Sequence, residues 1–154
     1  PTAPGDLPQA HPRLDPMTDH DPVFRLQVYR RFSDLDPLGH VNNVVFYDYL
    51  QEARVQLLQK LGFMQVEGFS LVVVKQEMTY RKPLLLSPEP ITIESWVNHI
   101  GNSSFTFHYR IHDEVGDLAA VASTVLAAVD LATGRPVRLN PELRAALLEL
   151  TIDR

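Results

Sequence analysis

The residues best suited to chemistry lie between Phe32 and Asn43, in the run Phe-Ser-Asp-Leu-Asp-Pro-Leu-Gly-His-Val-Asn-Asn. This run places the carboxylate of Asp36 shortly before a long apolar segment with helical spacing. A helix start offers free backbone N–H groups and the positive end of the helix dipole, which would polarise an ester or thioester carbonyl. Asp36 would then supply the base or the nucleophile, so the run predicts a hydrolase site.

The same residues also suit an ordinary turn. Asp-Pro followed by Gly is common in turns, where Asp34 and Asp36 would simply cap loop N–H groups. We assign that structural role to Asp34 and keep both roles open for Asp36. His40 has two interpretations as well, because a histidine in a turn often hydrogen-bonds to backbone and does no chemistry.

A strand and a helix must position this run. Apolar and polar residues alternate from Phe24 to Tyr29, which predicts a half-buried strand leading into the Asp36 turn. The helix is expected over residues 44–61, with Asn42 or Asn43 as N-cap and Gly62 just past its end. Its apolar residues recur every three or four positions and also occupy other sides of the helix, so we expect it to be enclosed.

Four further segments have strand composition: residues 71–80, 91–100, 104–111 and 118–131. Prolines, Gly-Asn and Gly-Asp lie in the gaps, which predicts hairpin-like connections. Parallel crossovers would need a dozen or more residues each, so the sheet should be antiparallel. We therefore predict an α+β fold, a five-stranded antiparallel sheet wrapped around the long helix.

Small and aromatic residues fit this core. Ala120, Ala122 and Ala128 in the last strand would let the helix approach closely, and alternating aromatic residues at 105, 107 and 109 would pack beneath it. A short amphipathic helix is expected through Leu150, with Pro141 in its first turn.

Length and composition point to one domain. The chain has 154 residues and 45% hydrophobic content, with no Cys and a net charge of −5. These values predict a cytoplasmic protein without disulfides or thiolate metal sites, and they argue against general nucleic-acid binding. No segment is long and apolar enough to insert into a membrane. Residues 1–22 hold half of the twelve prolines and predict an irregular arm, and residues 23–154 predict a single domain.

The run from Asp36 to Asn43, followed by Tyr47 and Glu52-Ala53-Arg54, resembles the 4-hydroxybenzoyl-CoA thioesterase-like (YbgC/FadM-type) acyl-CoA thioesterases. The order of elements over residues 24–131 resembles their hotdog fold. The resemblance implies that Asp36 attacks the thioester carbonyl or activates the attacking water. It also implies that the backbone N–H of Asn43 is the oxyanion donor.

Other positions of this run would bind or orient the substrate. Gly39 fits a turn that brings backbone close to a ligand, and Tyr47 belongs to the same pattern. His40 and Asn42 are polar groups that could orient water, Asp36 or the acyl carbonyl. Glu52 is a second carboxylate, but nine residues of helix separate it from Asn43 by roughly 13 Å, so we expect it to pair with a basic residue.

The phosphates of CoA require cations near the pocket mouth. Arg81 and Lys82 follow the second strand, and Asn102, Ser103 and Ser104 form a polar turn after the third. A solvated strand end is the alternative interpretation of these residues. Arg54 is expected on a solvated or interface side of the helix.

No metal or further cofactor is expected beyond the CoA carried by the substrate. His108 and His112 would stand roughly 13 Å apart on one strand, too far to share a metal ion. Exposed sheet edges and the family resemblance both predict a homodimer or homotetramer. An acyl carrier protein (acyl-ACP) thioesterase and a non-catalytic acyl-CoA-binding module remain as alternatives, and a hydratase is disfavoured because no Asp-x-Asn-x-x-His pattern occurs.

Overall fold

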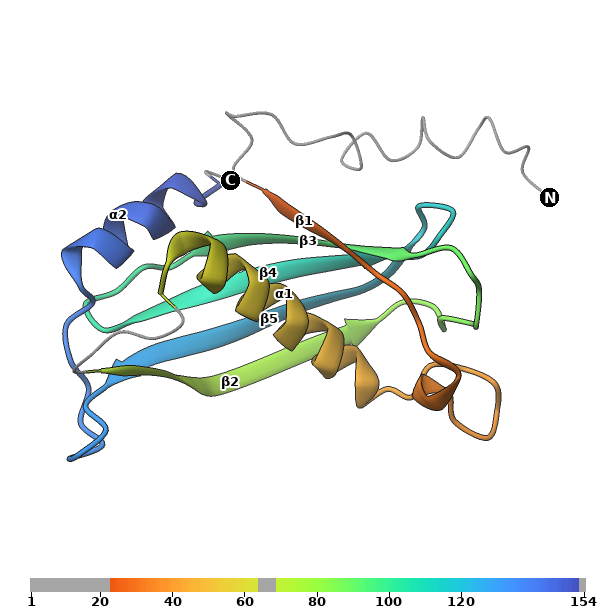
Figure 1. Cartoon of the computed structure of the whole chain (residues 1–154), viewed down its shortest axis with the longest axis horizontal. Helices are drawn as coiled ribbons and strands as arrows, with labels where there is room; N and C mark the ends of the chain where they lie inside the picture. Colours follow the sequence, from red (N-terminus) through yellow and green to blue (C-terminus); the bar gives the residue numbers. More distant parts are fainter. Residues whose placement is uncertain (1–22, 64–68, 153–154) are drawn as a thin grey trace.

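The structure is a computed structural model that describes residues 23–63 and 69–152. It contains one antiparallel five-stranded sheet with the long helix α1 across one face and a shorter helix, α2, at one end (Figure 1). The predicted N-terminal arm, residues 1–22, lies outside the described residues. The elements are β1 (Phe24–Val28), α1 (Val45–Leu61), β2 (Ser70–Tyr80), β3 (Ile91–Asn98), β4 (Ser104–His112), β5 (Leu118–Val129) and α2 (Pro141–Glu149).

The strands are hydrogen-bonded in the order β1-β3-β4-β5-β2, and every neighbouring pair is antiparallel. The turns after β3 and β4 are hairpins, as predicted. The predicted hairpin between β2 and β3 is wrong, because β2 pairs with β5 at the opposite side of the sheet. The proline-containing segment 81–90 is long enough to cross the end of the sheet and return the chain beside β1.

Helix α1 begins one residue later than predicted. Its N-cap is Val44, so neither Asn42 nor Asn43 takes that position. Asn42 still contributes, because its side-chain Oδ1 accepts a hydrogen bond from the Val44 N–H at 2.9 Å. The helix ends at Gly62, whose φ of 82° is the left-handed conformation that glycine adopts without strain.

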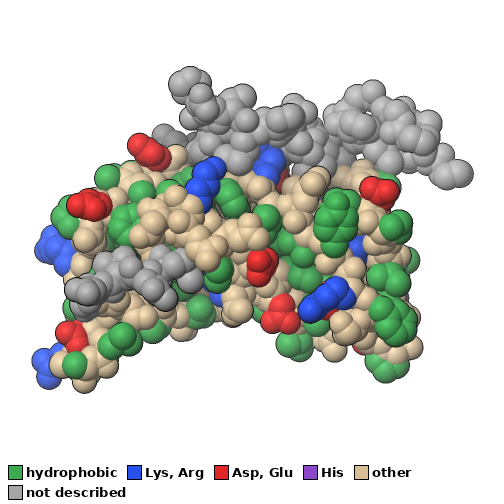
Figure 2. All heavy atoms as spheres, viewed as in Figure 1, with side chains coloured by type: hydrophobic (Ala, Val, Ile, Leu, Met, Phe, Trp, Pro, Cys, Tyr) green, Lys and Arg blue, Asp and Glu red, His purple; other side chains and the backbone are tan. Residues whose placement is uncertain are grey.

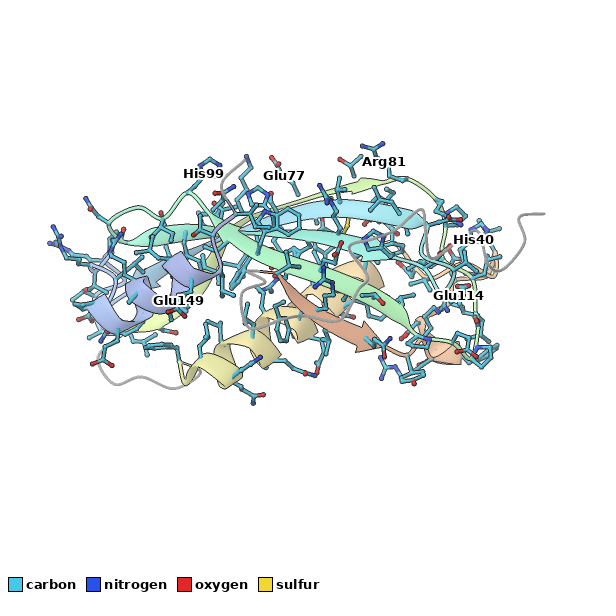
Figure 3. The ribbon with its side chains drawn as sticks, turned by 90° about the horizontal axis from the view of Figure 1, so that it is seen from above. His40, Glu77, Arg81, His99, Glu114 and Glu149 are labelled. Atoms are coloured by element: carbon cyan, nitrogen blue, oxygen red, sulfur yellow. The ribbon has the colours of Figure 1, made fainter. Side chains whose placement is uncertain are left out.

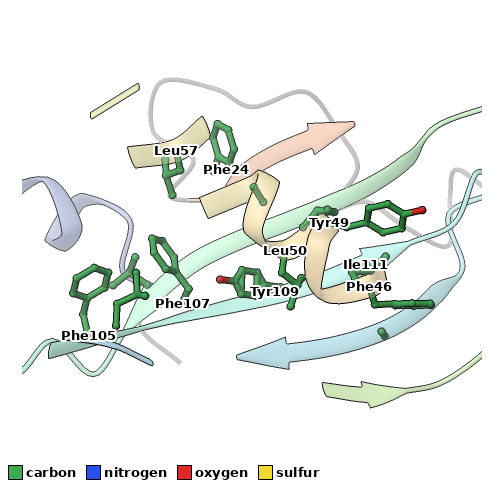
Figure 4. Close-up of a cluster of buried hydrophobic side chains, with 14 of the residues drawn as sticks. Phe24, Phe46, Tyr49, Leu50, Leu57, Phe105, Phe107, Tyr109 and Ile111 are labelled. Carbon is green, nitrogen blue, oxygen red and sulfur yellow. The ribbon is translucent and has the colours of Figure 1, made fainter. Parts of the chain in front are cut away.

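The apolar side of α1 packs on the sheet to form the core (Figure 4). The predicted aromatic residues Phe105, Phe107 and Tyr109 are almost completely buried there, and so are Ala120 and Ala128. Helix α2 adds Leu143 and Leu147 to the same cluster. The opposite side of α1 is exposed at Gln51, Glu52 and Gln59, so the expectation that the helix is enclosed is wrong within one chain. Burial of the sheet-facing side holds the first turn of α1 in a fixed place relative to the sheet. Among the described helices, none is long and apolar enough to cross a membrane.

Arg54 lies on the buried side of α1, which contradicts the predicted solvated position. Its side chain is only 7% exposed. Nη1 lies 3.2 Å from the Gln76 amide oxygen and 3.3 Å from the hydroxyl oxygens of Tyr109 and Thr124. These acceptors belong to β2, β4 and β5, so one guanidinium connects the helix to three strands.

Candidate active site

The segment between β1 and α1 is held in place by Asp34. The Asp34 carboxylate is 3% exposed and accepts hydrogen bonds from the Arg31 N–H at 2.9 Å and the Tyr49 hydroxyl at 2.7 Å. Burial opposes ionisation of Asp34, but these hydrogen bonds and the Arg31 side chain outweigh it and lower the pKa of Asp34. The Asp34 carbonyl also accepts the Asn42 N–H at 2.9 Å. Asp34 therefore has the structural role expected from its place in the turn.

The two carboxylate oxygens of Asp36 have different environments. Oδ1 accepts hydrogen bonds from the N–H groups of Leu38 at 2.9 Å and His40 at 3.2 Å, which fixes the orientation of the side chain. Within residues 23–63 and 69–152, Oδ2 accepts no hydrogen bond. One oxygen of Asp36 therefore caps the turn, as the structural interpretation expects, and the other is available to a ligand. The chemical role of Asp36 stays a prediction.

Gly39 is needed for its backbone conformation. Its φ is 84°, which strains any residue with a side chain. An added Cβ would meet no atom within 4 Å, and Gly39 does not line the cavity described below. The turn therefore requires glycine for its φ, and a close approach of this backbone to a ligand stays a prediction.

The start of α1 presents an open donor. The backbone N–H of Asn43 has no hydrogen-bond partner among the described residues, whereas the neighbouring N–H groups of Asn42 and Val44 are both bonded. The Asn43 carbonyl accepts the Tyr80 hydroxyl at 2.6 Å. A free N–H at the positive end of a helix can bind a carbonyl oxygen and stabilise negative charge that develops on it.

Asp36 and Asn43 line the same cavity, of about 360 Å³, at the end of the sheet where β2 finishes. The full lining consists of Asp36, His40, Val41, Asn43, Phe46, Tyr80, Arg81, Lys82 and Pro83. The cavity thus combines an available carboxylate, an open N–H and two cations. Asn42 and Tyr47 are adjacent to this lining and do not belong to it.

Four lining residues were not predicted from the sequence: Val41, Pro83, Tyr80 and Phe46. Tyr80 and Phe46 are the aromatic ones. Their rings meet edge to face, with centroids 5.0 Å apart. Tyr80 ends a strand pattern and directly precedes Arg81. Its position next to a predicted CoA-binding residue was the signal in the sequence that could have identified it. Phe46 has the spacing of a core residue, and it is one, but its ring also reaches the cavity.

The two cations of the cavity differ in their partners. Lys82 forms ion pairs with Asp113 at 2.7 Å and Asp117 at 3.2 Å, and the Asp113 hydrogen bond is the largest cause that raises the pKa of Lys82. Arg81 is exposed and has no ion pair in the described part of the chain. Arg81 is therefore the cation that remains available to an anionic ligand, and the charge of Lys82 is already balanced.

The turn containing Asn102, Ser103 and Ser104 lies at the other end of the sheet. Figure 3 shows His40 and Arg81 toward one end of the molecule and His99, shortly before this turn, toward the other. The Asn102 carbonyl accepts the Leu139 N–H just before α2 at 2.8 Å, and Arg144 on α2 donates to the same carbonyl at 3.5 Å, so the turn packs against this end of the chain. Within one chain these residues lie far from Arg81, because β3 runs from the Arg81 end of the sheet to the other end. Their contact with CoA stays a prediction.

Apolar side chains surround the cavity end. Phe32, Leu38 and Leu85 are 80%, 79% and 55% exposed, and all three lie on the segments that flank the cavity. Figure 2 shows hydrophobic side chains gathered at this end of the face that carries α1, with acidic and basic groups interspersed. No group of three or more His, Cys, Asp or Glu side chains in the described residues could hold a metal ion.

Comparison with known proteins gives consistent matches. The sequence profile described as the Thioesterase-like superfamily matches residues 30–147. The chain is 30% identical over 131 residues to the long-chain acyl-CoA thioesterase FadM of Escherichia coli (strain K12), covering 82% of this chain and 98% of that protein.

Solved structures share the fold as well. A thioesterase from Thermus thermophilus, complexed with coenzyme A and Zn, has a TM-score of 0.71 and 34% identity, covering 86% of this chain and 97% of that one. A predicted thioesterase from Bacillus stearothermophilus has a TM-score of 0.77 at 24% identity, covering 86% and 98%. The second likeness concerns the fold alone.

Proposed function

Because this chain belongs to the thioesterase-like superfamily, we propose that it hydrolyses an acyl-CoA thioester to a free acid and CoA. The observation that carries the proposal is that Asp36, with an open carboxylate oxygen, and Asn43, with an open N–H, line one cavity at the start of α1. The printed activity of FadM and the coenzyme A in the Thermus thermophilus structure support the choice of substrate.

In the proposed reaction the thioester carbonyl oxygen accepts the Asn43 N–H. Asp36 Oδ2 either takes a proton from water, which attacks the carbonyl carbon, or attacks that carbon itself to form an acyl anhydride that water then hydrolyses. In both routes negative charge collects on the carbonyl oxygen, where the N–H and the helix dipole stabilise it. The C–S bond breaks and the CoA thiolate leaves and takes up a proton.

The remaining residues of the run would orient the reactants. His40 lines the cavity and its N–H already fixes Asp36, so its ring is placed to orient water or the acyl carbonyl. Asn42 supports the helix start, and Tyr47 lies next to the cavity. Arg81 would pair with a phosphate of CoA, and Lys82 would contribute less because two carboxylates already neutralise it.

A second copy of the chain would cover β2. This strand is an edge of the sheet, and Val72, Val73 and Val74 on it are 37%, 46% and 62% exposed. An exposed apolar edge of this length favours pairing with another strand. We propose a homodimer through β2, with a tetramer as the next level of assembly, in which the partner completes the acyl pocket.

Thiol release from a panel of short, long, branched and aromatic acyl-CoAs tests the activity. Asp36→Asn should remove most of the rate and leave folding intact, because the amide cannot act as base or nucleophile. Asp48→Asn is the matched control, since Asp48 is a carboxylate in the first turn of α1 that does not line the cavity. Unchanged turnover in Asp36→Asn would refute the mechanism.

Two further comparisons separate the remaining possibilities. A single turnover in ¹⁸O-water that labels the Asp36 carboxylate identifies the nucleophilic route, with water attacking the Asp36 carboxyl carbon of the anhydride. Label in the released acid alone fits the general-base route, and trapping with hydroxylamine detects an anhydride that water would open at its acyl carbon. Equal acyl chains on CoA and on acyl carrier protein separate the two carrier preferences. Binding of acyl-CoA without release, insensitive to Asp36→Asn, would instead identify a non-catalytic binding module.

A further inference from the structure

We infer that Tyr80 is a positioning residue for the oxyanion donor, acting through its hydroxyl on the peptide that follows Asn43. The inference rests on the proposed function, because it concerns the donor of that reaction. Tyr80 ends β2 and Asn43 precedes α1, so this contact joins the sheet to the helix start at the cavity itself.

The peptide that joins Asn43 to Val44 is held at both its carbonyl and its N–H. Its carbonyl, that of Asn43, accepts the Tyr80 hydroxyl at 2.6 Å, and its N–H, that of Val44, donates to Asn42 Oδ1 at 2.9 Å. The preceding peptide carries the open N–H, and its Asn42 carbonyl accepts the Val45 N–H at 2.9 Å. The direction of the Asn43 N–H therefore depends on two fixed peptide planes.

Of these three contacts, the one from Tyr80 originates outside the helix-start segment. The Asn42 and Val45 groups are neighbours in sequence and move together with α1. The Tyr80 hydroxyl instead ties the helix start to β2, beside the position where Asp36 and the substrate would meet. The residues just before Asn43 are anchored separately, since the Val41 N–H donates to the Leu84 carbonyl at 2.8 Å and the Asn42 N–H donates to the Asp34 carbonyl at 2.9 Å. Loss of the Tyr80 bond would therefore free the peptide between Asn43 and Val44 and leave the rest of the loop in place.

The ring of Tyr80 is positioned independently of its hydroxyl. It packs edge to face on Phe46, and 42% of Tyr80 is exposed, so the residue is not a core element. Burial and the neighbouring Tyr47 raise the pKa of Tyr80, which keeps the hydroxyl protonated and able to donate throughout the neutral range. Replacing Tyr80 by Phe would remove the donor and preserve the ring contact.

The test is Tyr80→Phe in the full chain, assayed with an acyl-CoA that the wild type hydrolyses. We expect kcat to fall roughly tenfold with KM changed by less than about twofold, since a displaced donor costs transition-state stabilisation and little ground-state binding. Hydrogen–deuterium exchange of residues 41–47 should accelerate without substrate. Tyr29→Phe is the control, because Tyr29 is 66% exposed and lies away from this cavity.

Three results would overturn the inference. The first is a kcat for Tyr80→Phe within twofold of wild type while Asp36→Asn is inactive, which leaves the proposed function standing. The second is a lower kcat with unchanged exchange of residues 41–47, which would place Tyr80 on the substrate and not on the loop. The third is unchanged exchange of residues 41–47 in Tyr80→Phe together with full turnover in Asp36→Asn. In that case the proposed function fails as well, for its own reason.

Discussion

Tyr49→Phe should destabilise the protein, because it removes a hydrogen bond to Asp34, a carboxylate that takes no part in the proposed reaction. The Tyr49 hydroxyl donates to Asp34 at 2.7 Å, and both residues are at least 95% buried. A hydrogen bond to a charged group contributes about 1.5–3 kcal/mol, and the buried carboxylate cannot recover it from water. For a chain of this length, a loss of about 2 kcal/mol lowers Tm by roughly 4–8 °C.

The effect should depend on pH in a defined direction. The folded pKa of Asp34 is lowered from 3.8, so its stabilisation is complete above pH 3.8 and is lost as the pH falls through the lower folded value. The difference between wild type and Tyr49→Phe should therefore be full at pH 7 and shrink in strongly acidic solution.

Urea unfolding at fixed protein concentration measures the unfolding free energy at pH 7 and its change with pH, with Tyr29→Phe as the matched control. An unfolding free energy for Tyr49→Phe within about 0.5 kcal/mol of wild type at pH 7, the range of ordinary surface changes, would refute the reasoning. A difference that stays constant into acid would show that Asp34 is not the partner responsible.

Three further outcomes are expected. Arg81→Ala should raise KM for an acyl-CoA roughly tenfold and leave KM for a short thioester without the nucleotide unchanged, while Lys82→Ala should raise KM for the acyl-CoA less. Steady-state kinetics on both substrates measure this, and equal effects of the two substitutions would contradict it. Arg30→Met should lower the unfolding free energy by about 2–4 kcal/mol, because Arg30 is buried and donates to the Leu85 carbonyl at 2.7 Å and to Glu114 at 2.9 Å. Wild-type stability in Arg30→Lys would argue against a need for the forked guanidinium. Gly39→Ala should cost about 1–2 kcal/mol through its φ of 84° and also reduce turnover, and thermal melts equal to wild type would contradict the strain.

Local pattern was sufficient for most of the fold. The period of the apolar residues predicted α1 and all five strands to within one or two residues, because each pattern reports how one element meets the core. Strand order was not encoded in the same way. The segment after β2 has turn composition whether the chain returns beside its own strand or crosses to the far edge, so the hairpin prediction failed there.

The sequence alone could group those candidate site residues that are close together in the chain. Asp36, His40 and Asn43 lie within eight residues of one another, and the structure places all three on one cavity. Asn102 and Tyr80 depend instead on which end of the sheet a strand reaches, and this follows only from topology. Arg54 was misplaced because charge was weighted above spacing, although it lies four residues after Leu50 on the same side of α1.

The guanidinium of Arg54 has a consequence for how reproducibly the fold assembles. An apolar helix face can slide on a sheet at small cost, but three oxygens on β2, β4 and β5 accept this group in only one helix rotation. A slip by a single residue would break these contacts, turn α1 by about 100° and move its start by about 1.5 Å. The alignment of the helix start with Asp36 is thus specified deep in the core, roughly 16 Å along the helix axis from Asn43.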